Sequence, residues 1–236
     1  MSSAALPIRQ VPVLLGGETD AVASWIESPS PAHVTTWLVV TVLGSAAFGA
    51  AMGWWRAPEQ ALFTAVKLPL VLLCTALGNA LLNAMLAPLL GVNIGLRQSL
   101  LAVLMSFTIA GAILGGVTPL LAFVIWNAPP LERTASAGTT HAFILLTIVA
   151  ATAFAGVAAN VRLLRLLERL GGGAGAARRV LCAWLAANLF FGSQLSWILR
   201  PFVGSPGLPV QFLRDEPLKG SFYEAVFYSL GRLFLD

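Results

Sequence analysis

Charge is scarce in this sequence: only 10% of its 236 residues are Asp, Glu, Lys or Arg, whereas 58% are hydrophobic. Soluble globular proteins carry about a quarter charged residues, because their surface faces water. With so few charges the apolar excess must face another apolar medium, which is lipid. The composition therefore excludes an ordinary soluble domain and predicts an integral membrane protein whose first partner is the lipid bilayer.

Cysteine and histidine are also scarce, with two residues of each. Cys74 and Cys182 lie inside long apolar runs, so no disulfide framework is expected. His33 and His141 are predicted on opposite sides of the membrane and should not share a metal ion. Ser193 follows a glycine but has no base beside it, so we interpret it as structural. We expect no metal, no cofactor and no catalytic residue.

Five segments are long enough to cross a bilayer core about 30 Å thick, which needs roughly 20 helical residues. The predicted spans cover residues 36–55, 67–90, 97–126, 141–163 and a last run from just after Arg179 to 199. Trp37 and the pair Trp54–Trp55 flank the first span, as expected of aromatic belts at headgroup level.

Shorter elements are predicted beside these spans. Pro58 suits a first helical turn, so residues 56–67 are predicted to form an interfacial helix, from whose end Lys67 extends its stem to the headgroups. Gly91 is a predicted helix stop, and Gly115–Gly116 with Pro119 predict a kink in the third span.

The predicted fold class is all-α: a polytopic transmembrane helical bundle of about five spans, an interfacial helix before the second span and a C-terminal amphipathic helix. That last helix begins with a Ser221–Glu224 capping box. Residues 1–33 are expected to be a partly irregular, loosely packed cytoplasmic lead-in, residues 34–200 the transmembrane domain, and residues 201–236 an external tail. The tail helix carries an apolar stripe of Phe222, Val226, Leu230 and Leu233.

Orientation follows from the arginines between the fourth and fifth spans, where a surplus of four positive charges equals the net charge of the whole chain. Cytoplasmic loops are enriched in Lys and Arg, so this segment is predicted to be cytoplasmic. The N-terminus is then cytoplasmic and the C-terminus external, in a bacterial plasma (inner) membrane. Because the basic charge reports topology, we expect no nucleic-acid partner. The segment holds Arg162, Arg165, Arg169, Arg178 and Arg179 against Glu168.

Amide side chains are the main polar groups predicted inside the membrane: Asn79, Asn83, Asn160, Asn188 and Gln194. In one interpretation they bond across helices, each contributing about 1 kcal/mol. In the other they line a polar path for a small neutral solute or an ion. The spans lack Asp, Glu, Arg and His near their midpoints, which argues against proton-coupled pumps.

The external tail is the most distinctive local feature. Residues 200–209 hold three prolines and two glycines, a composition typical of successive turns. Arg200, Arg214 and Arg232 are candidate contacts for a partner. The tail is compatible with a plug, a partner-docking surface or a plain amphipathic end.

Two observations relate the spans to each other and to a known family. A similar succession of residues links 73–91, around Asn79, with 181–204, around Asn188; a true repeat would make the second and fifth spans partners. With a cytoplasmic lead-in, five spans, an external end and a Pro58–Glu59 helix before a hairpin, the chain resembles the Yip family of five-span membrane proteins. That resemblance implies membrane organisation through protein partners.

The sequence therefore favours a non-enzymatic integral membrane protein that acts as a scaffold, an assembly subunit or a membrane organiser, with protein partners or as a homo-oligomer. The alternative is a passive channel or facilitator with an amide-lined path. The two differ in one observable: a scaffold predicts amides paired in a dry core, and a channel predicts amides along a continuous wet path.

Overall fold

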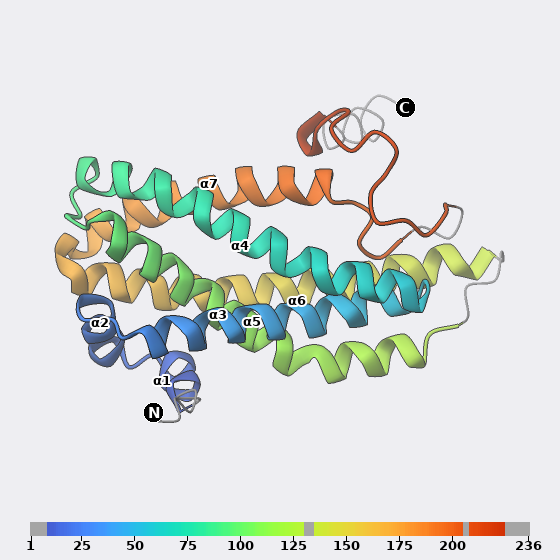
Figure 1. The fold of residues 1–236 in the computed structure, drawn as a ribbon, viewed down its shortest axis with the longest axis horizontal. Helices are drawn as coiled ribbons and strands as arrows, with labels where there is room; N and C mark the ends of the chain where they lie inside the picture. Colours follow the sequence, from blue (N-terminus) through green and yellow to red (C-terminus); the bar gives the residue numbers. More distant parts are fainter. Residues whose placement is uncertain (1–8, 130–134, 205–207, 225–236) are drawn as a thin grey trace.

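The computed structural model describes residues 9–129, 135–204 and 208–224, and every regular element in these ranges is a helix. Five helices there are long and apolar enough to cross a membrane, and they run side by side in an elongated bundle (Figure 1). The all-α membrane bundle with five candidate spans is therefore confirmed. The five are α3 (Pro31–Trp54), α4 (Pro58–Leu89), α5 (Leu96–Trp126), α6 (Ala135–Leu167) and α7 (Gly173–Ile198).

Local sequence signals set several helix ends. Ser30 caps α3, because its hydroxyl accepts a hydrogen bond from the His33 backbone N–H at 3.2 Å, and Pro31 occupies the first helical position. The chain leaves α4 through Gly91, whose φ of 95° is left-handed, so the predicted helix stop is confirmed. Gln98 Oε1 accepts from the Gly95 N–H at 3.2 Å at the start of α5.

The region before the second span differs from the prediction. Residues 58–67 are helical as expected, but they continue directly into the span, so that α4 is one helix of 32 residues. Pro69 lies inside α4 and does not end it. A hydropathy criterion measures only the apolar part of a helix, whereas Ala, Leu, Glu and Gln favour helix irrespective of the medium. The separate interfacial helix is therefore the first part of α4.

The arginine-rich segment also differs, because it is helical throughout. α6 continues past the predicted end of the fourth span, a π-helical turn η1 (Glu168–Gly172) follows, and α7 starts at Gly173. Arg178 and Arg179 thus lie in the first turns of α7 and not before it. The positive φ of Gly173, 64°, lets the chain reverse between the two helices.

The lead-in is packed, in contrast to the loosely packed segment expected. It forms α1 (Gln10–Gly16) and α2 (Thr19–Glu27), which contact α5 and α6. Leu14 and Ile26 are each only 1% exposed. Their burial gives these short helices the tertiary support that isolated helices of this length lack. Residues 1–8 lie outside the described part of the lead-in.

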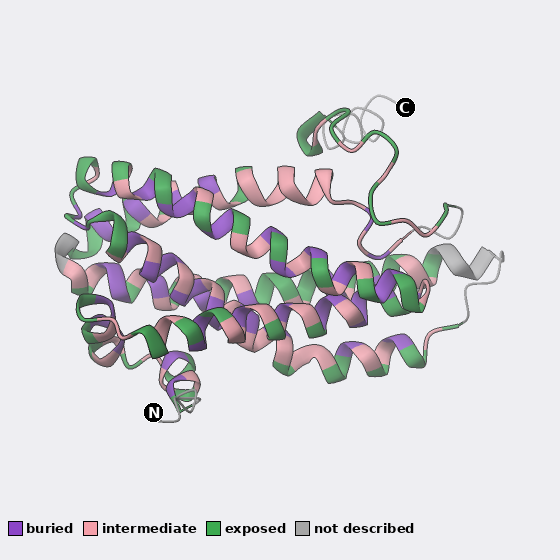
Figure 2. Ribbon diagram, in the orientation of Figure 1, coloured by how far each residue is buried: buried purple, intermediate pink, exposed green. Residues whose placement is uncertain are grey.

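The buried side chains form two clusters along the bundle. Figure 2 marks the buried residues on each helix in purple. One joins the lead-in to the arginine-rich half and contains Trp37 and Trp184; the other lies in the opposite half around Phe48. Trp37 is fully buried. The prediction that it belongs to an aromatic belt was wrong, because hydropathy does not reveal which side of a helix faces its neighbours.

Glycines let α3 approach its neighbours closely. A Cβ atom added to Gly44 would overlap the Gly111 carbonyl of α5, and one added to Gly49 or Gly53 would overlap backbone carbonyls of α4. Gly115 lies against the Gly44 backbone in the same crossing. Small residues allow such backbone contact between membrane helices, where van der Waals packing drives association.

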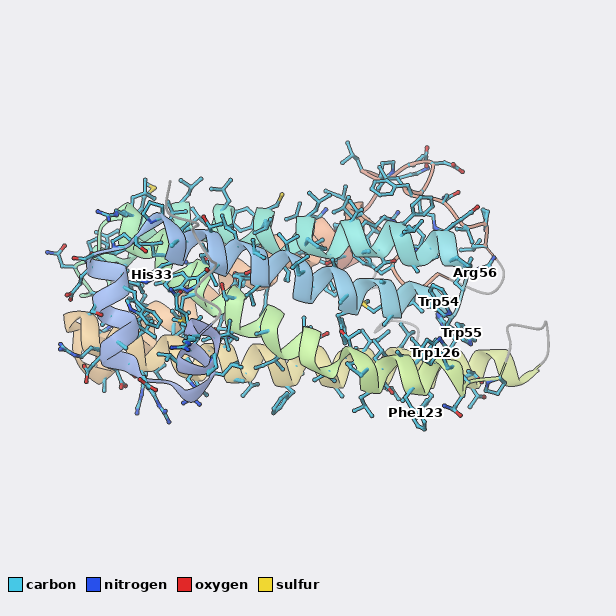
Figure 3. The ribbon with its side chains drawn as sticks, turned by 60° about the horizontal axis from the view of Figure 1, so that its bottom comes forward. His33, Trp54, Trp55, Arg56, Phe123 and Trp126 are labelled. Carbon is cyan, nitrogen blue, oxygen red and sulfur yellow. The ribbon has the colours of Figure 1, made fainter. Side chains whose placement is uncertain are left out.

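Aromatic residues gather at the end of the bundle opposite the lead-in. Figure 3 shows Trp54, Trp55 and Trp126 together at that end, whereas His33 lies at the other. Trp54 is 50% and Trp126 73% exposed, as side chains of an interfacial belt should be, but Trp55 is only 9% exposed and belongs to the buried cluster around Phe48, so the prediction was wrong for Trp55. α5 changes direction part-way along (Figure 1), and its helix interior contains Pro119, in agreement with the predicted kink.

Candidate functional site

Three polar side chains on one face of α4 hold the start of the tail. Gln60 Nε2 lies 3.0 Å from the Pro201 carbonyl oxygen and 2.8 Å from that of Phe202. Thr64 Oγ1 is 2.8 Å from the Phe202 oxygen, and Lys67 Nζ donates to the Pro201 oxygen at 2.8 Å. We call Gln60, Thr64 and Lys67 the tail clasp.

Lys67 is the most unusual member of the clasp, because it is fully buried. Its Nζ lies 6.0, 5.9 and 4.9 Å from the ring centroids of Phe63, Phe202 and Phe212. Lys67 takes part in neither of the ion pairs that the described residues form, Arg169–Asp20 and Lys219–Glu216. A carbonyl oxygen and aromatic faces surround its ammonium group in place of a carboxylate. The expectation that Lys67 extends to the headgroups was wrong. The tail covers it instead.

Two further contacts fasten the tail beyond the clasp. Arg56 Nη2 donates to the Leu208 carbonyl oxygen at 2.9 Å, and His141 Nε2 lies 3.1 Å from the Gly204 oxygen. The His141 ring stacks on Trp55 at 5.8 Å between centroids. Side chains of α4, α6 and the α3–α4 connection therefore all bond to backbone carbonyls of the tail, at residues 201, 202, 204 and 208.

The tail then returns alongside α7 (Figure 1). Trp197 Nε1 donates to the Lys219 carbonyl oxygen at 3.2 Å, and the Tyr223 hydroxyl donates to the Leu189 oxygen at 3.1 Å. Leu189 precedes the end of α7 by nine residues, about 14 Å along a helix. The last described residues therefore lie beside the C-terminal half of α7 and not across the end of the bundle.

The predicted C-terminal helix is described only at its beginning. Ser221 Oγ accepts a hydrogen bond from the Glu224 N–H at 3.1 Å, as the capping box predicts. The remaining residues of that helix, Arg232 among them, lie outside the described residues. Of the other two tail arginines, Arg200 folds back on α7, with its guanidinium carbon 3.9 Å from the centroid of the Trp197 ring. Arg214 is half-buried within the tail.

A second polar site joins α4 to α7. Asn79 Nδ2 donates to Asn188 Oδ1 at 2.6 Å, and Asn83 Nδ2 donates to Asn79 Oδ1 at 2.5 Å. Asn79 and Asn83 are fully buried. We call these three side chains the amide ladder. It pairs the second and fifth spans through Asn79 and Asn188, the asparagines found within the two similar stretches 73–91 and 181–204.

The structure does not bring all five candidate amides together. Asn160 Nδ2 donates to the Gly156 carbonyl oxygen of its own helix at 2.7 Å, and Gln194 is half-buried on α7. Buried oxygen atoms of Asn83 and Asn160 have no hydrogen-bond partner among the described residues. Three of the five amides therefore form one chain of hydrogen bonds, and the one bond that Asn160 makes is within α6.

The arginine-rich end contacts the lead-in and the α4–α5 connection. Arg162 Nη2 donates to the Leu15 carbonyl oxygen at 2.9 Å, and Arg179 Nη2 donates to that of Leu90 at 3.2 Å. Arg169 and Asp20 form an ion pair at 2.7 Å, but both side chains are largely exposed. Such a pair contributes little stability. These contacts place the lead-in and the predicted cytoplasmic arginines at the same end of the bundle.

The tail clasp was not identified from the sequence, although part of its signal is visible there. Gln60, Thr64 and Lys67 are spaced four and three residues apart and so share a helix face. Their partners are backbone carbonyls, which have no side-chain signature. Among the described residues, no three His, Cys, Asp or Glu side chains come together as a metal site requires.

Comparisons with protein-family models, with curated proteins and with solved structures gave no significant match. The resemblance to the Yip family therefore stays a prediction.

Proposed function

We propose that this protein is a non-enzymatic membrane scaffold, a rigid bundle that holds its tail at the external face for a protein partner or a second copy. The observation that carries the proposal is the amide ladder. The hydrogen bond from Asn79 to Asn188 joins α4 to α7 in a partly buried contact, and the bond from Asn83 to Asn79 supports it within α4, the arrangement expected of amides that stabilise a bundle. The interior polarity is thereby used for packing.

The tail supports the same proposal. Clasp residues, Arg56 and His141 fasten its backbone at residues 201, 202, 204 and 208. The described part of the tail presents Leu208 and Leu218, which are 48% and 78% exposed. Backbone that is already held by hydrogen bonds loses less conformational entropy on binding than free backbone, which favours recognition by a partner.

A flux assay distinguishes the scaffold from the passive channel. We expect liposomes containing the purified protein to pass urea, glycerol and monovalent ions at the rate of protein-free liposomes, within about twofold, because a conduit needs a continuous polar lining. Asn83→Leu should leave this rate unchanged. A protein-dependent flux that Asn83→Leu abolishes would overturn the scaffold in favour of the channel.

Photo-crosslinking tests the scaffold directly. A benzophenone amino acid in place of Leu218 should give a discrete adduct in living cells, about fivefold or more above the same probe at Leu146, an exposed apolar position of α6. Lys67→Glu, which releases the tail, should remove the adduct. Equal, diffuse labelling at both positions would contradict a tail-centred partner site.

We also propose that the arginine-rich end is cytoplasmic, since five arginines and one glutamate gather there. In a variant with Cys74→Ala and Cys182→Ala, a membrane-impermeant maleimide should label Leu218→Cys from outside the plasma membrane. It should label Ala174→Cys, beside the arginines, only after permeabilisation. Labelling of Ala174→Cys first would reverse the orientation.

A further inference from the structure

An apolar groove of about 770 Å³ lies between three of the spanning helices. It is separate from the tail clasp and from the amide ladder. Val34 and Leu38 line it from α3, Leu73 and Leu77 from α4, and Leu100 and Leu104 from α5.

The groove opens sideways, because side chains on its rim are exposed. Leu38 is 39%, Leu77 56% and Leu96 48% exposed. These residues belong to helices that are apolar enough to span a membrane, so the medium at the opening is lipid. Filling this groove with water would be unfavourable, because its lining side chains are apolar. An acyl chain would pack against the same side chains favourably.

One end of the groove carries its single charged lining residue, Arg97. Arg97 lies in the first turn of α5, on the same side as the connection that precedes α3, so it stands where the helices reach the headgroup level. From Arg97 to Leu104 the groove follows α5 for seven residues, about 10 Å. A cation at the end of an apolar groove matches an anionic headgroup above an acyl chain.

We propose that this groove binds one acyl chain of an anionic phospholipid, whose phosphate contacts the Arg97 guanidinium. A planar guanidinium presents paired N–H donors that suit phosphate oxygens. The α3, α4 and α5 side chains supply the apolar contacts, and Arg97 selects the charge of the headgroup. The site does not depend on the scaffold proposal, because it uses none of the residues on which that proposal rests.

The test is lipid binding to the full-length protein by native mass spectrometry, with phosphatidylglycerol and phosphatidylcholine of identical acyl chains. Phosphatidylglycerol should bind about fivefold more tightly or better, the contribution of one arginine near a membrane surface. Arg97→Gln should remove this preference. Arg165→Gln removes an exposed arginine that does not line the groove, and it should keep the preference.

A second variant tests the acyl-chain part. Leu77→Trp fills the groove from its exposed rim, where the added volume does not displace the core. It should lower the binding affinity for both lipids by about fivefold or more. Inorganic phosphate should not compete at millimolar concentration. Equal affinity for the two lipids, equal losses in Arg97→Gln and Arg165→Gln, unchanged binding by Leu77→Trp, or competition by phosphate would each overturn the proposal.

Discussion

Lys67→Glu is expected to detach the tail from the bundle. The substitution removes the donor to the Pro201 oxygen and places a carboxylate against carbonyl oxygens and aromatic faces. A lost charge-assisted hydrogen bond and an unfavourably buried charge together amount to about 3–5 kcal/mol. The population of the detached tail should therefore increase about 100-fold or more.

The reactivity of a buried cysteine measures this detachment. Val203 is 6% exposed, so Val203→Cys in the Cys74→Ala, Cys182→Ala background should react with a maleimide only when the tail opens. The rate should rise about 100-fold in Lys67→Glu and much less in Lys67→Met, which keeps the apolar stem. Lys219→Glu changes a lysine whose side chain is 76% exposed and should leave the rate within about twofold. Equal rates in Lys67→Glu and Lys219→Glu would show that the clasp does not hold the tail.

Gly44→Val is expected to produce the largest loss of bundle stability. Because its Cβ would overlap the Gly111 carbonyl, α3 and α5 would have to move apart, and contacts would be lost in both buried clusters. Overpacking typically costs about 1–3 kcal/mol, and a backbone obstacle that cannot rotate away places this variant at or above the upper end.

Gly116→Val is the matched control, since an added Cβ there meets no atom within 4 Å. It changes the intrinsic helix propensity, an effect below about 1 kcal/mol. In thermal unfolding of detergent-solubilised protein, we expect Gly44→Val to lower Tm by about 10 °C or more and Gly116→Val to lower it by only a few degrees. Similar Tm values for the two variants would mean that the α3–α5 crossing adjusts without cost.

The features that sequence predicted well are those that apolar content controls. Long hydrophobic runs located all five spans, and Gly91 marked the end of α4 because a left-handed φ favours glycine. Helix extent was harder, since polar helix formers continue α4 and α6 past their apolar stretches. The lead-in was predicted to be loosely packed because it has few apolar residues. The sequence alone does not show that these residues pack against α5 and α6.

The remaining differences between prediction and structure have two causes. The sequence does not show which side of a helix faces its neighbours, and it does not show which backbone carbonyl a polar side chain will bond to. Trp37 and Lys67 lie at positions typical of a membrane interface, yet both are buried because their sides of α3 and α4 face protein. The sequence showed that Asn79 and Asn188 each lie among the polar residues of a span. It did not show that they pair, because pairing requires α4 and α7 to be neighbours. Asn160 has the same spacing pattern but faces its own Gly156 carbonyl. Spacing identifies a stripe without identifying its partner.

The positions of the amide ladder and the tail clasp have a mechanical consequence. On α4, Lys67 and Asn79 are twelve residues apart, about 18 Å; their partners Pro201 and Asn188 are separated by thirteen residues. One attachment would leave α7 free to pivot against α4, whereas two attachments at this distance remove that freedom. The pair behaves as a brace: a pull on the tail is shared between two points of α4, at Lys67 and at Asn79, and does not bend the chain at Arg200 alone.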